Sequence, residues 1–550
     1  MIGTDSDRRA WWLWTRPDDT SGRRQTTVGA VGQLEPAATG MVRAAEVIAS
    51  MCLATDLGMG FPFEHGFHAT LTTMRLCEVL DVDEDTASRT YYACLLMYAG
   101  CTVDGVERSQ VFGGSMTEHL THRQFGSAVE SLGGVVRALP SPGAPLPRRT
   151  FQAITGLPRA ARFRGGHFAA LCEVAGMLAE RLGVPQSVYE MFPFLTERWD
   201  GAGVLKRASG DEIPLPLRII HVGRDATYQR LIGDDDYVTN VIASRAGHSF
   251  DPDVAAGLLD NAADVLGPRE LSETMWEDVL ASEPRPWLTL GGPAIDQALG
   301  AIGAFSDLVS PHLSGHCSGV AQLATAAAGL QGFGPAEAET IRRAALVHDV
   351  GRTAVGTRVW NKPGPLTADE REQVRLHPYH TERVLAPSPF LSELASIAMA
   401  HHERLDGSGY HRGLDSSSLS RAARLLAVAD AFQSKTEPRP YREPLSPKEA
   451  TEVLVGRARE GGFDPVMVMA VAEAAGEARP AIDRPAGLTE REVEVVGLLA
   501  RGMQTKQIAR ELDISAKTVD RHIQNSYRKI GVSSRAAATL FATENGLLPR

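Results

Sequence analysis

Apolar residues recur at helical spacing along most of the chain beyond residue 41, and this pattern predicts an all-α protein. The first apolar positions of this kind are Val47, Ile48, Met51, Leu53, Leu71, Met74, Leu76 and Val79. Residues 1–40 instead mix charge, glycine, threonine and proline without a period, so we expect a disordered N-terminal segment. No run approaches the ~20 apolar residues of a membrane span, so we expect no membrane contact.

The segment 488–550 shows a clear pattern of three helices and their ends. Thr489 and Glu492 form a capping box before the first helix, Gly502 marks its end, and a second helix begins at Thr505. A third helix begins at Ser515. Its apolar face consists of Val519, Ile523, Tyr527 and Ile530. Its opposite face carries Lys517, Arg521, Gln524, Asn525 and Arg528, side chains of the kind that contact phosphates and base edges.

Proline and glycine divide the chain between these patterned regions. Two prolines and a glycine within 478–487 disfavour a continuous helix there, and the stretch 268–286 reads as another connection. A chain of 550 residues is also too long for one core. We therefore expect a disordered segment 1–40, helical domains over 41–266 and 288–476, a linker 477–487 and a small bundle over 488–550.

The two larger domains are predicted to be copies of one repeat. Phe194–Gly203 in the first copy parallels Ala400–Gly409 in the second at matching offsets. The first copy lacks several polar residues of the second. His401-His402 is replaced by Leu195-Thr196 and Asp430 by Arg224, and the position of His348-Asp349 falls near Tyr98-Ala99. His68 and His167 lie close to the first and middle histidine positions. We expect the first copy to pack or to sense a ligand, and not to catalyse.

Charge and cysteine content indicate which partners the chain can bind and in which cellular compartment it acts. The net charge is −11, so the molecule as a whole does not resemble a nucleic-acid-binding protein. The segment 488–550 differs, because it holds ten Lys and Arg against seven Asp and Glu. The six cysteines are scattered and lack a C-x-x-C pair, which indicates reduced thiols. With no signal-peptide pattern at the start, we expect a cytoplasmic protein.

Histidine is concentrated in one stretch of the second copy. Eight of the sixteen histidines lie between His312 and His411, and the doublet His348-Asp349 closes an apolar run. The ligand-type residues of this stretch and its continuation are His316, His348, Asp349, His377, His401, His402 and Asp430. Imidazole mixed with carboxylate suits divalent iron, manganese or zinc, so we expect a metal site here.

The same stretch resembles the HD-GYP phosphohydrolase domains, which include cyclic di-GMP phosphodiesterases. The matching segments are His348–Gly351, Asn361–Thr367, Leu376–Pro378, His401–Tyr410, the Asp430 motif and Arg439–Arg442. Two departures stand out. His411 replaces the proline of the GYP signature, and Arg352 replaces the lysine usual after HD-x-G.

The resemblance implies a site with two divalent metal ions, iron or manganese in preference to zinc. One ion would be held by His316, His348, Asp349 and Asp430, and the second by His377, His401 and His402, with Asp349 bridging. Asp349 and Arg352 would be catalytic. Arg352, Arg439 and Arg442 would bind the substrate phosphates, since a guanidinium matches two phosphate oxygens. For Arg439 and Arg442 the alternative is an ordinary surface charge.

Residues 488–550 resemble the LuxR-type helix-turn-helix from Leu488–Glu492 to Gly531–Arg535. The resemblance implies that the helix from Ser515 enters the DNA major groove and that the module binds as a homodimer. The expected DNA contacts are Lys506, Lys517, Thr518, Asp520, Arg521, Gln524 and Arg528. Asp520 stands where a lysine is common, and an acid there can accept from a cytosine amino group. The alternative is an amphipathic bundle that binds another protein.

Two functions from different classes follow from these resemblances. The first is a transcription regulator that carries a metal-dependent phosphodiesterase for cyclic di-GMP or a related nucleotide. The second is a regulator whose HD core binds a nucleotide or metal without turning it over. The complete set of ligand residues favours the first function, whereas Arg352 and His411 keep the second open.

Overall fold

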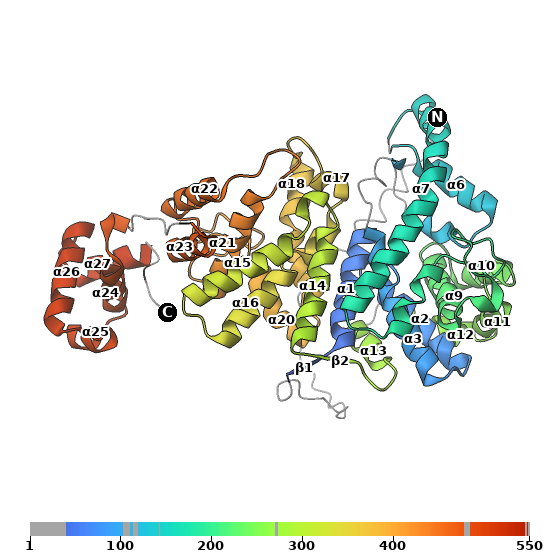
Figure 1. Cartoon of the computed structure of the whole chain (residues 1–550), viewed down its shortest axis with the longest axis horizontal. Helices are drawn as coiled ribbons and strands as arrows, with labels where there is room; N and C mark the ends of the chain where they lie inside the picture. The colour runs from blue at the N-terminus through green and yellow to red at the C-terminus, as the bar shows by residue number, and fades with distance from the viewer. Residues whose placement is uncertain are drawn as a thin grey trace, which may run out of the picture. The chain divides into compact units, whose positions relative to one another are not determined.

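The computed structural model describes residues 40–102, 111–113, 119–141, 143–269, 273–477, 485–544 and 547, and residues 41–550 form one compact unit. The fold is all-α, as the apolar pattern predicted (Figure 1). Within the described residues one small sheet interrupts it, where β1 (Met41–Arg43) pairs antiparallel with β2 (Thr289–Gly291). The expectation of a disordered start falls on residues 1–39, outside the described part of the chain.

Helices of the first region extend from α1 to α13. They are α1 (Ala44–Met59), α2 (His65–Val79), α3 (Glu84–Leu96), η2 (Ala99–Thr102), η3 (Thr121–Arg123), α6 (Ala128–Ala138), α7 (Leu146–Arg181), α8 (Gln186–Tyr189), η4 (Phe192–Phe194), η5 (Gly210–Glu212), α9 (Leu215–Arg230), α10 (Asp235–Arg245), α11 (Pro252–Asp260), α12 (Ala262–Leu266) and α13 (Met275–Ala281).

Helices of the second region extend from α14 to α23. They are α14 (Pro293–Asp307), η6 (Pro311–Leu313), α15 (His316–Leu330), α16 (Pro335–Val347), η7 (Val350–Ala354), α17 (Thr357–Trp360), α18 (Ala368–Arg375), α19 (His377–Leu385), α20 (Pro389–Ala398), α21 (Arg421–Thr436), α22 (Pro447–Arg459) and α23 (Pro465–Ala474). Proline lies in the first turn of seven of these twelve helices, because its fixed φ suits that position and its missing amide costs nothing there.

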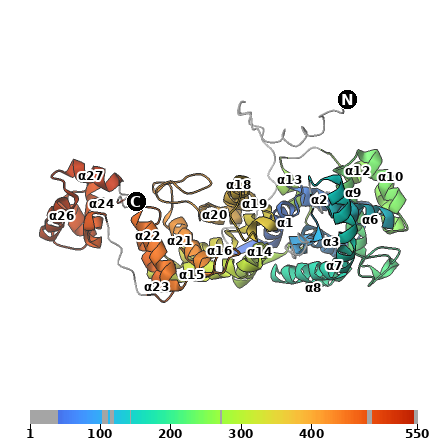
Figure 2. The same ribbon diagram turned by 90° about the horizontal axis from the view of Figure 1, so that it is seen from above.

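Helix α1 belongs to the packing of both regions. Twelve of its sixteen residues are buried, as expected of a helix that is covered all round. It contacts α2 and α3 in the first region and η7, α14 and α19 in the second (Figure 1, Figure 2). The hydroxyl of Thr353 in η7 donates to the carbonyl of Ala54 in α1, at 3.0 Å. The apolar core is continuous across the predicted boundary between the two copies.

Helices α2 and α15 begin in the same way in the two regions. Each starts at a histidine, His65 or His316. In each, a preceding aspartate accepts a hydrogen bond from the backbone amide of the helix's second residue, Asp56 at 3.1 Å and Asp307 at 3.3 Å. These shared contacts agree with the predicted repeat. They also place His65, rather than His68, at the position of the first ligand histidine.

The C-terminal module has a hydrophobic core of its own. Its elements are η8 (Pro485–Gly487), α24 (Glu490–Ala500), α25 (Thr505–Glu511), α26 (Ala516–Ile530) and α27 (Arg535–Glu544). The predicted capping box of Thr489 and Glu492 is formed at the start of α24, and Ser515 caps α26. Val519 and Ile523 are buried, which confirms the predicted inner face of α26. Over the described residues, no helix combines the length and the hydrophobicity needed to cross a membrane.

Candidate metal centre and DNA-binding surface

Three histidines of the second region are oriented by their own backbone. His348 follows α16, His377 begins α19, and His401 lies just after α20. In each ring Nδ1 lies close to the carbonyl oxygen three residues earlier, at 2.7, 2.5 and 2.6 Å respectively. When Nδ1–H donates to that carbonyl, Nε2 is left with its lone pair directed away from the backbone. The end of each helix thus supplies one oriented ligand nitrogen.

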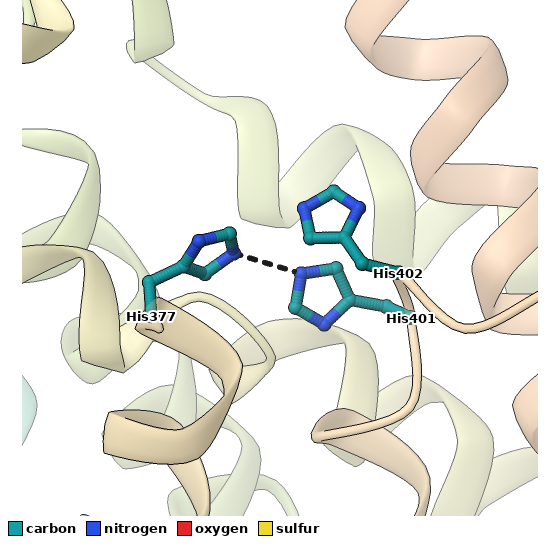
Figure 3. Close-up of side chains that lie close together, drawn as sticks. All are labelled: His377, His401 and His402. Carbon is teal, nitrogen blue, oxygen red and sulfur yellow. Dashed lines mark hydrogen bonds between the residues drawn. The ribbon is translucent and has the colours of Figure 1, made fainter. Parts of the chain in front are cut away.

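Ligand-type side chains form two groups, and Asp349 belongs to the first and faces the second. The first group is His316, His348, Asp349 and Asp430, and the second is His377, His401 and His402 (Figure 3). Within each group, ligand atoms of all members lie within 4.8 Å of one another. Oδ2 of Asp349 is 2.8 Å from Nε2 of His348, whereas Oδ1 is 3.2 Å from Nε2 of His377. One carboxylate therefore faces both groups, each with a different oxygen.

Several buried polar atoms of these groups fit a metal ion. Nε2 of His348, both carboxylate oxygens of Asp349 and Oδ1 of Asp430 have no hydrogen bond within the described residues, although Asp349 is ion-paired. Buried carboxylates are costly without cations close by. Nitrogen and oxygen donors in this mixture suit divalent iron, manganese or zinc. The chain thus holds candidate metal-binding residues where the motif predicted them.

The two groups differ in how they hold protons. Burial opposes protonation of His316, but the close carboxylates of Asp349, Asp430 and Glu437 raise its pKa to about 9. Burial likewise opposes protonation of His348, yet Asp349 raises its pKa well above the usual value. In the second group burial lowers the pKa of His377 to about 4. A metal ion would therefore have to displace protons from the first group, and would meet a neutral His377 in the second.

Arg352 lies inside the candidate centre. Arg352 is buried, with 4% of its surface exposed. Its Nη2 atom is 2.6 Å from Oδ2 of Asp349 and 3.4 Å from Nε2 of His316. Its Nε and Nη1 atoms are buried without a hydrogen bond to described residues. Two guanidinium donors of Arg352 are thus left without a hydrogen bond to the described residues, and its contact with a substrate phosphate stays a prediction. The peptide bond between Tyr410 and His411, at the altered GYP signature, is cis.

The other two predicted phosphate ligands contact the protein itself. Arg439 donates to the backbone carbonyl of His312 at 2.8 Å and to Oε2 of Glu437 at 3.0 Å. Arg442 donates to backbone carbonyls at the end of α21, including that of Lys435 at 2.9 Å. Substrate binding by Arg439 and Arg442 stays a prediction, and these contacts favour structural roles for both. Glu437 was missed by sequence reasoning, although it follows Asp430 by two helical turns.

The predicted DNA contacts belong to α25 and α26. Thr518 is half-buried, and the exposed members are Lys506, Lys517, Asp520, Arg521, Gln524 and Arg528. The Asp520 carboxylate accepts from the hydroxyl of Thr505 at 3.2 Å, so it links α26 to the start of α25. Nη2 of Arg528 donates to Oδ1 of Asn525 at 2.9 Å. The polar face expected for base and phosphate contacts is therefore open to solvent.

Two segments of the chain match known protein families. Residues 305–467 match the HD domain, and residues 486–542 match the luxR family of bacterial regulatory proteins. The chain therefore joins an HD domain to a LuxR-family DNA-binding domain, as the motifs predicted.

Relatives extend the likeness beyond these two segments. The chain is 28% identical over 422 residues to 3'3'-cGAMP-specific phosphodiesterase 3 of Vibrio cholerae, and the match covers 74% of this chain and 90% of that protein. A cyclic di-GMP phosphodiesterase of Pseudomonas aeruginosa is 39% identical over 134 residues, and the match spans 24% of this chain and 32% of the relative. The crystal structure of a cyclic GMP-AMP phosphodiesterase of V. cholerae shares the fold, with a TM-score of 0.55 at 23% identity, over 80% of this chain and 98% of that one.

Proposed function

We propose that the second region is a phosphodiesterase that opens a cyclic dinucleotide with the help of two divalent metal ions. The observation that carries this proposal is the position of Asp349, whose two oxygens face two separate groups of buried ligand-type side chains. A carboxylate so placed can serve as a shared ligand of two cations. The catalytic region proposed is 288–476, and the first region, 41–266, is proposed to be non-catalytic.

The preference for iron or manganese over zinc rests on the resemblance to HD-GYP domains. The first group offers imidazole and carboxylate, the second offers three imidazoles beside Oδ1 of Asp349, and both suit a divalent transition metal. Two such ions would supply Lewis acidity toward a phosphodiester and would lower the pKa of a water molecule. The protein's own contribution is to hold the imidazoles of His348, His377 and His401 at fixed angles through their Nδ1 contacts. Arg352 would place a cation beside the phosphate oxygens.

The substrate class rests on the relatives. A relative matched over 74% of this chain is specific for 3'3'-cGAMP by its name, and others are cyclic di-GMP phosphodiesterases. Both molecules are cyclic dinucleotides closed by phosphodiester bonds. We propose that this chain hydrolyses a member of that class to a linear product.

A second function, binding without turnover, has one observation in its favour. Arg352 already neutralises Asp349 from within the centre, at 2.6 Å, where a cation would otherwise balance that carboxylate. A guanidinium held there competes with a metal ion for the same charge. In that case the HD domain would sense a nucleotide and leave it intact.

The deciding experiment uses the purified full chain. Metal content is measured first, and turnover of 3'3'-cGAMP and cyclic di-GMP is then followed by chromatography of the linear products. The phosphodiesterase proposal expects two bound ions and a linear product, both lost in Asp349→Ala. Nucleotide binding with metal present and no linear product would favour the sensor function.

We also propose that the LuxR-family module binds DNA as a homodimer, paired through α27. This proposal rests on the exposed polar face of α26 and on the family match. Two copies would present two recognition helices to half-sites of a DNA duplex. Since DNA is the proposed partner, the chain would act in the cytoplasm.

A further inference from the structure

His316 is oriented differently from His348, His377 and His401. Its Nε2 faces Asp349 Oδ2 at 3.3 Å and Asp430 Oδ1 at 3.2 Å. Its Nδ1 does not rest on a carbonyl of its own helix. Instead Nδ1 lies 2.8 Å from Oε2 of Glu437, which comes from the end of α21. The acceptor next to Nδ1 is thus a side-chain carboxylate in His316, whereas it is a backbone carbonyl in His348.

Glu437 is itself held in place from two sides. Nε2 of Gln433 donates to Oε1 at 2.9 Å, and Nη2 of Arg439 donates to Oε2 at 3.0 Å. Arg439 is anchored in turn, because its Nη1 donates to the carbonyl of His312. The result is a chain of contacts from η6 through Arg439 and Glu437 to His316. Glu437 is therefore held in place by Gln433 and Arg439, independently of its contact with His316.

We propose that Glu437 is a positioning residue of the candidate metal centre, and that Arg439 serves it by holding its carboxylate. Glu437 would accept the Nδ1–H of His316 and so keep Nε2 free to bind metal. This inference rests on the proposed function, because it assumes that His316 is a ligand. It assigns Arg439 to the support of the centre in place of the substrate contact predicted from the sequence.

The physical basis is the effect of an outer carboxylate on a ligand imidazole. A carboxylate that accepts from the second ring nitrogen fixes the tautomer and the ring angle, and it makes the ligand nitrogen more basic. Loss of such a partner costs ~10–100-fold in metal affinity in other proteins. Asp430 lies within α21, and Glu437 caps the C-terminal end of the same helix. Any shift of α21 would move both together.

The test measures Mn²⁺ affinity of the full chain by titration against a chelator of known affinity. Glu437→Ala is expected to weaken Mn²⁺ binding by ~10–100-fold. Glu437→Gln, which keeps an acceptor oxygen, is expected to weaken it less. Arg439→Ala is expected to weaken it measurably with little change in KM for 3'3'-cGAMP.

Arg442→Ala is the matched control for a general change in the conformation of the residues that follow α21. Arg442 fastens the same end of α21 through backbone carbonyls and does not touch Glu437. Its replacement is expected to leave Mn²⁺ affinity unchanged. An equal loss of Mn²⁺ affinity in Arg442→Ala and Glu437→Ala would show that the affinity depends only on the conformation of residues 437–442, and would overturn the inference.

Two further outcomes separate this inference from the proposed function. If the wild-type chain binds no Mn²⁺, Fe²⁺ or Zn²⁺, the metal-dependent function fails and the inference fails with it. If the wild type binds Mn²⁺ and Glu437→Ala binds it equally well, the inference alone fails. Should Glu437→Ala not fold, Arg439→Ala decides. An unchanged Mn²⁺ affinity together with a raised KM would return Arg439 to the substrate site.

Discussion

The carboxylate of Asp349 and the guanidinium of Arg352 form a buried ion pair, with 2.6 Å between Oδ2 and Nη2. The two residues are three positions apart, at the junction of α16 and η7, so the pair is set by local chain geometry. It connects the residue that faces both ligand groups with an arginine whose Nε and Nη1 atoms have no hydrogen bond to the described residues. Replacing Arg352 should therefore have other consequences than replacing Asp349.

Arg352→Ala should abolish most turnover and leave metal binding in place. Arg352 is not among the ligand-type side chains of either group, whereas its charge would balance the phosphate in the transition state. Loss of one such stabilising donor typically lowers kcat by ~10²–10³-fold. Turnover and metal content measured on the same preparation check this. Wild-type turnover in the variant would exclude a catalytic role for Arg352.

Asp349→Asn should release most of the bound metal from both groups. The amide lacks the charge that two cations would share, and its nitrogen cannot act as a ligand. Elemental analysis of metal per chain gives the result directly. Asp406→Asn serves as the control, because Asp406 is exposed and accepts hydrogen bonds from Ser408 in a turn. Full metal content in Asp349→Asn would contradict the bridging role.

Acidification should destabilise the first region through two buried histidines. Burial lowers the pKa of His65 and of His221 to about 3, so both are neutral in the folded chain. The unfolded chain binds these protons near pH ~6.5. Below that pH the unfolded state binds more protons, and the free energy of unfolding falls by up to ~1.4 kcal/mol per pH unit for each histidine. Above it, this contribution stays constant.

The measurement is the melting temperature of the full chain between pH ~7.5 and ~5.5, compared among variants. His221→Gln should flatten the dependence on pH, because it removes the buried imidazole whose Nε2 donates to the carbonyl of Leu195 and whose protonation causes the loss of stability. The exposed His248 offers the matched control, and His248→Gln should keep the wild-type slope. Equal slopes in all three proteins would refute the assignment.

Gly351→Ala should distort the junction between η7 and α19. A Cβ there would lie 2.1 Å from the carbonyl oxygen of His377 and 2.3 Å from the amide nitrogen of Thr381, both backbone atoms. Overpacking of this kind costs ~1–3 kcal/mol, and here it would also shift a ligand histidine. We expect a lower melting temperature and weaker Mn²⁺ binding. Gly356→Ala, which meets nothing within 4 Å, should change neither.

Arg521→Ala should weaken DNA binding in a sequence-dependent way. If the exposed guanidinium reaches a base edge, its loss costs ~1–3 kcal/mol and relaxes the preference at one position of the site. A DNA site selected from a random pool by the wild-type chain provides the probe. Arg528→Ala is the comparison, and it should weaken all sequences alike if Arg528 touches only phosphate. No salt-dependent DNA binding by the wild type would count against the module's role.

Local patterns in the sequence determined the helical class, the C-terminal module and the identity of the ligand-type residues. Helical periodicity and helix caps are short-range properties, so Thr489 and Glu492 could be read directly and are confirmed. The spacing of His348, Asp349 and Asp430 within motifs likewise carried enough information to predict that they meet. The structure places all three in one buried group.

Tertiary structure decided what the spacing could not express. Glu437 and His316 are 121 positions apart, and only the packing of α21 against α15 brings them together. The same holds for α1, whose burial between η7 and the first region joins two segments that composition had separated. An ion pair or a shared core depends on where two surfaces meet in space. One-dimensional periodicity records which face of a helix is apolar, and it does not record which partner covers that face.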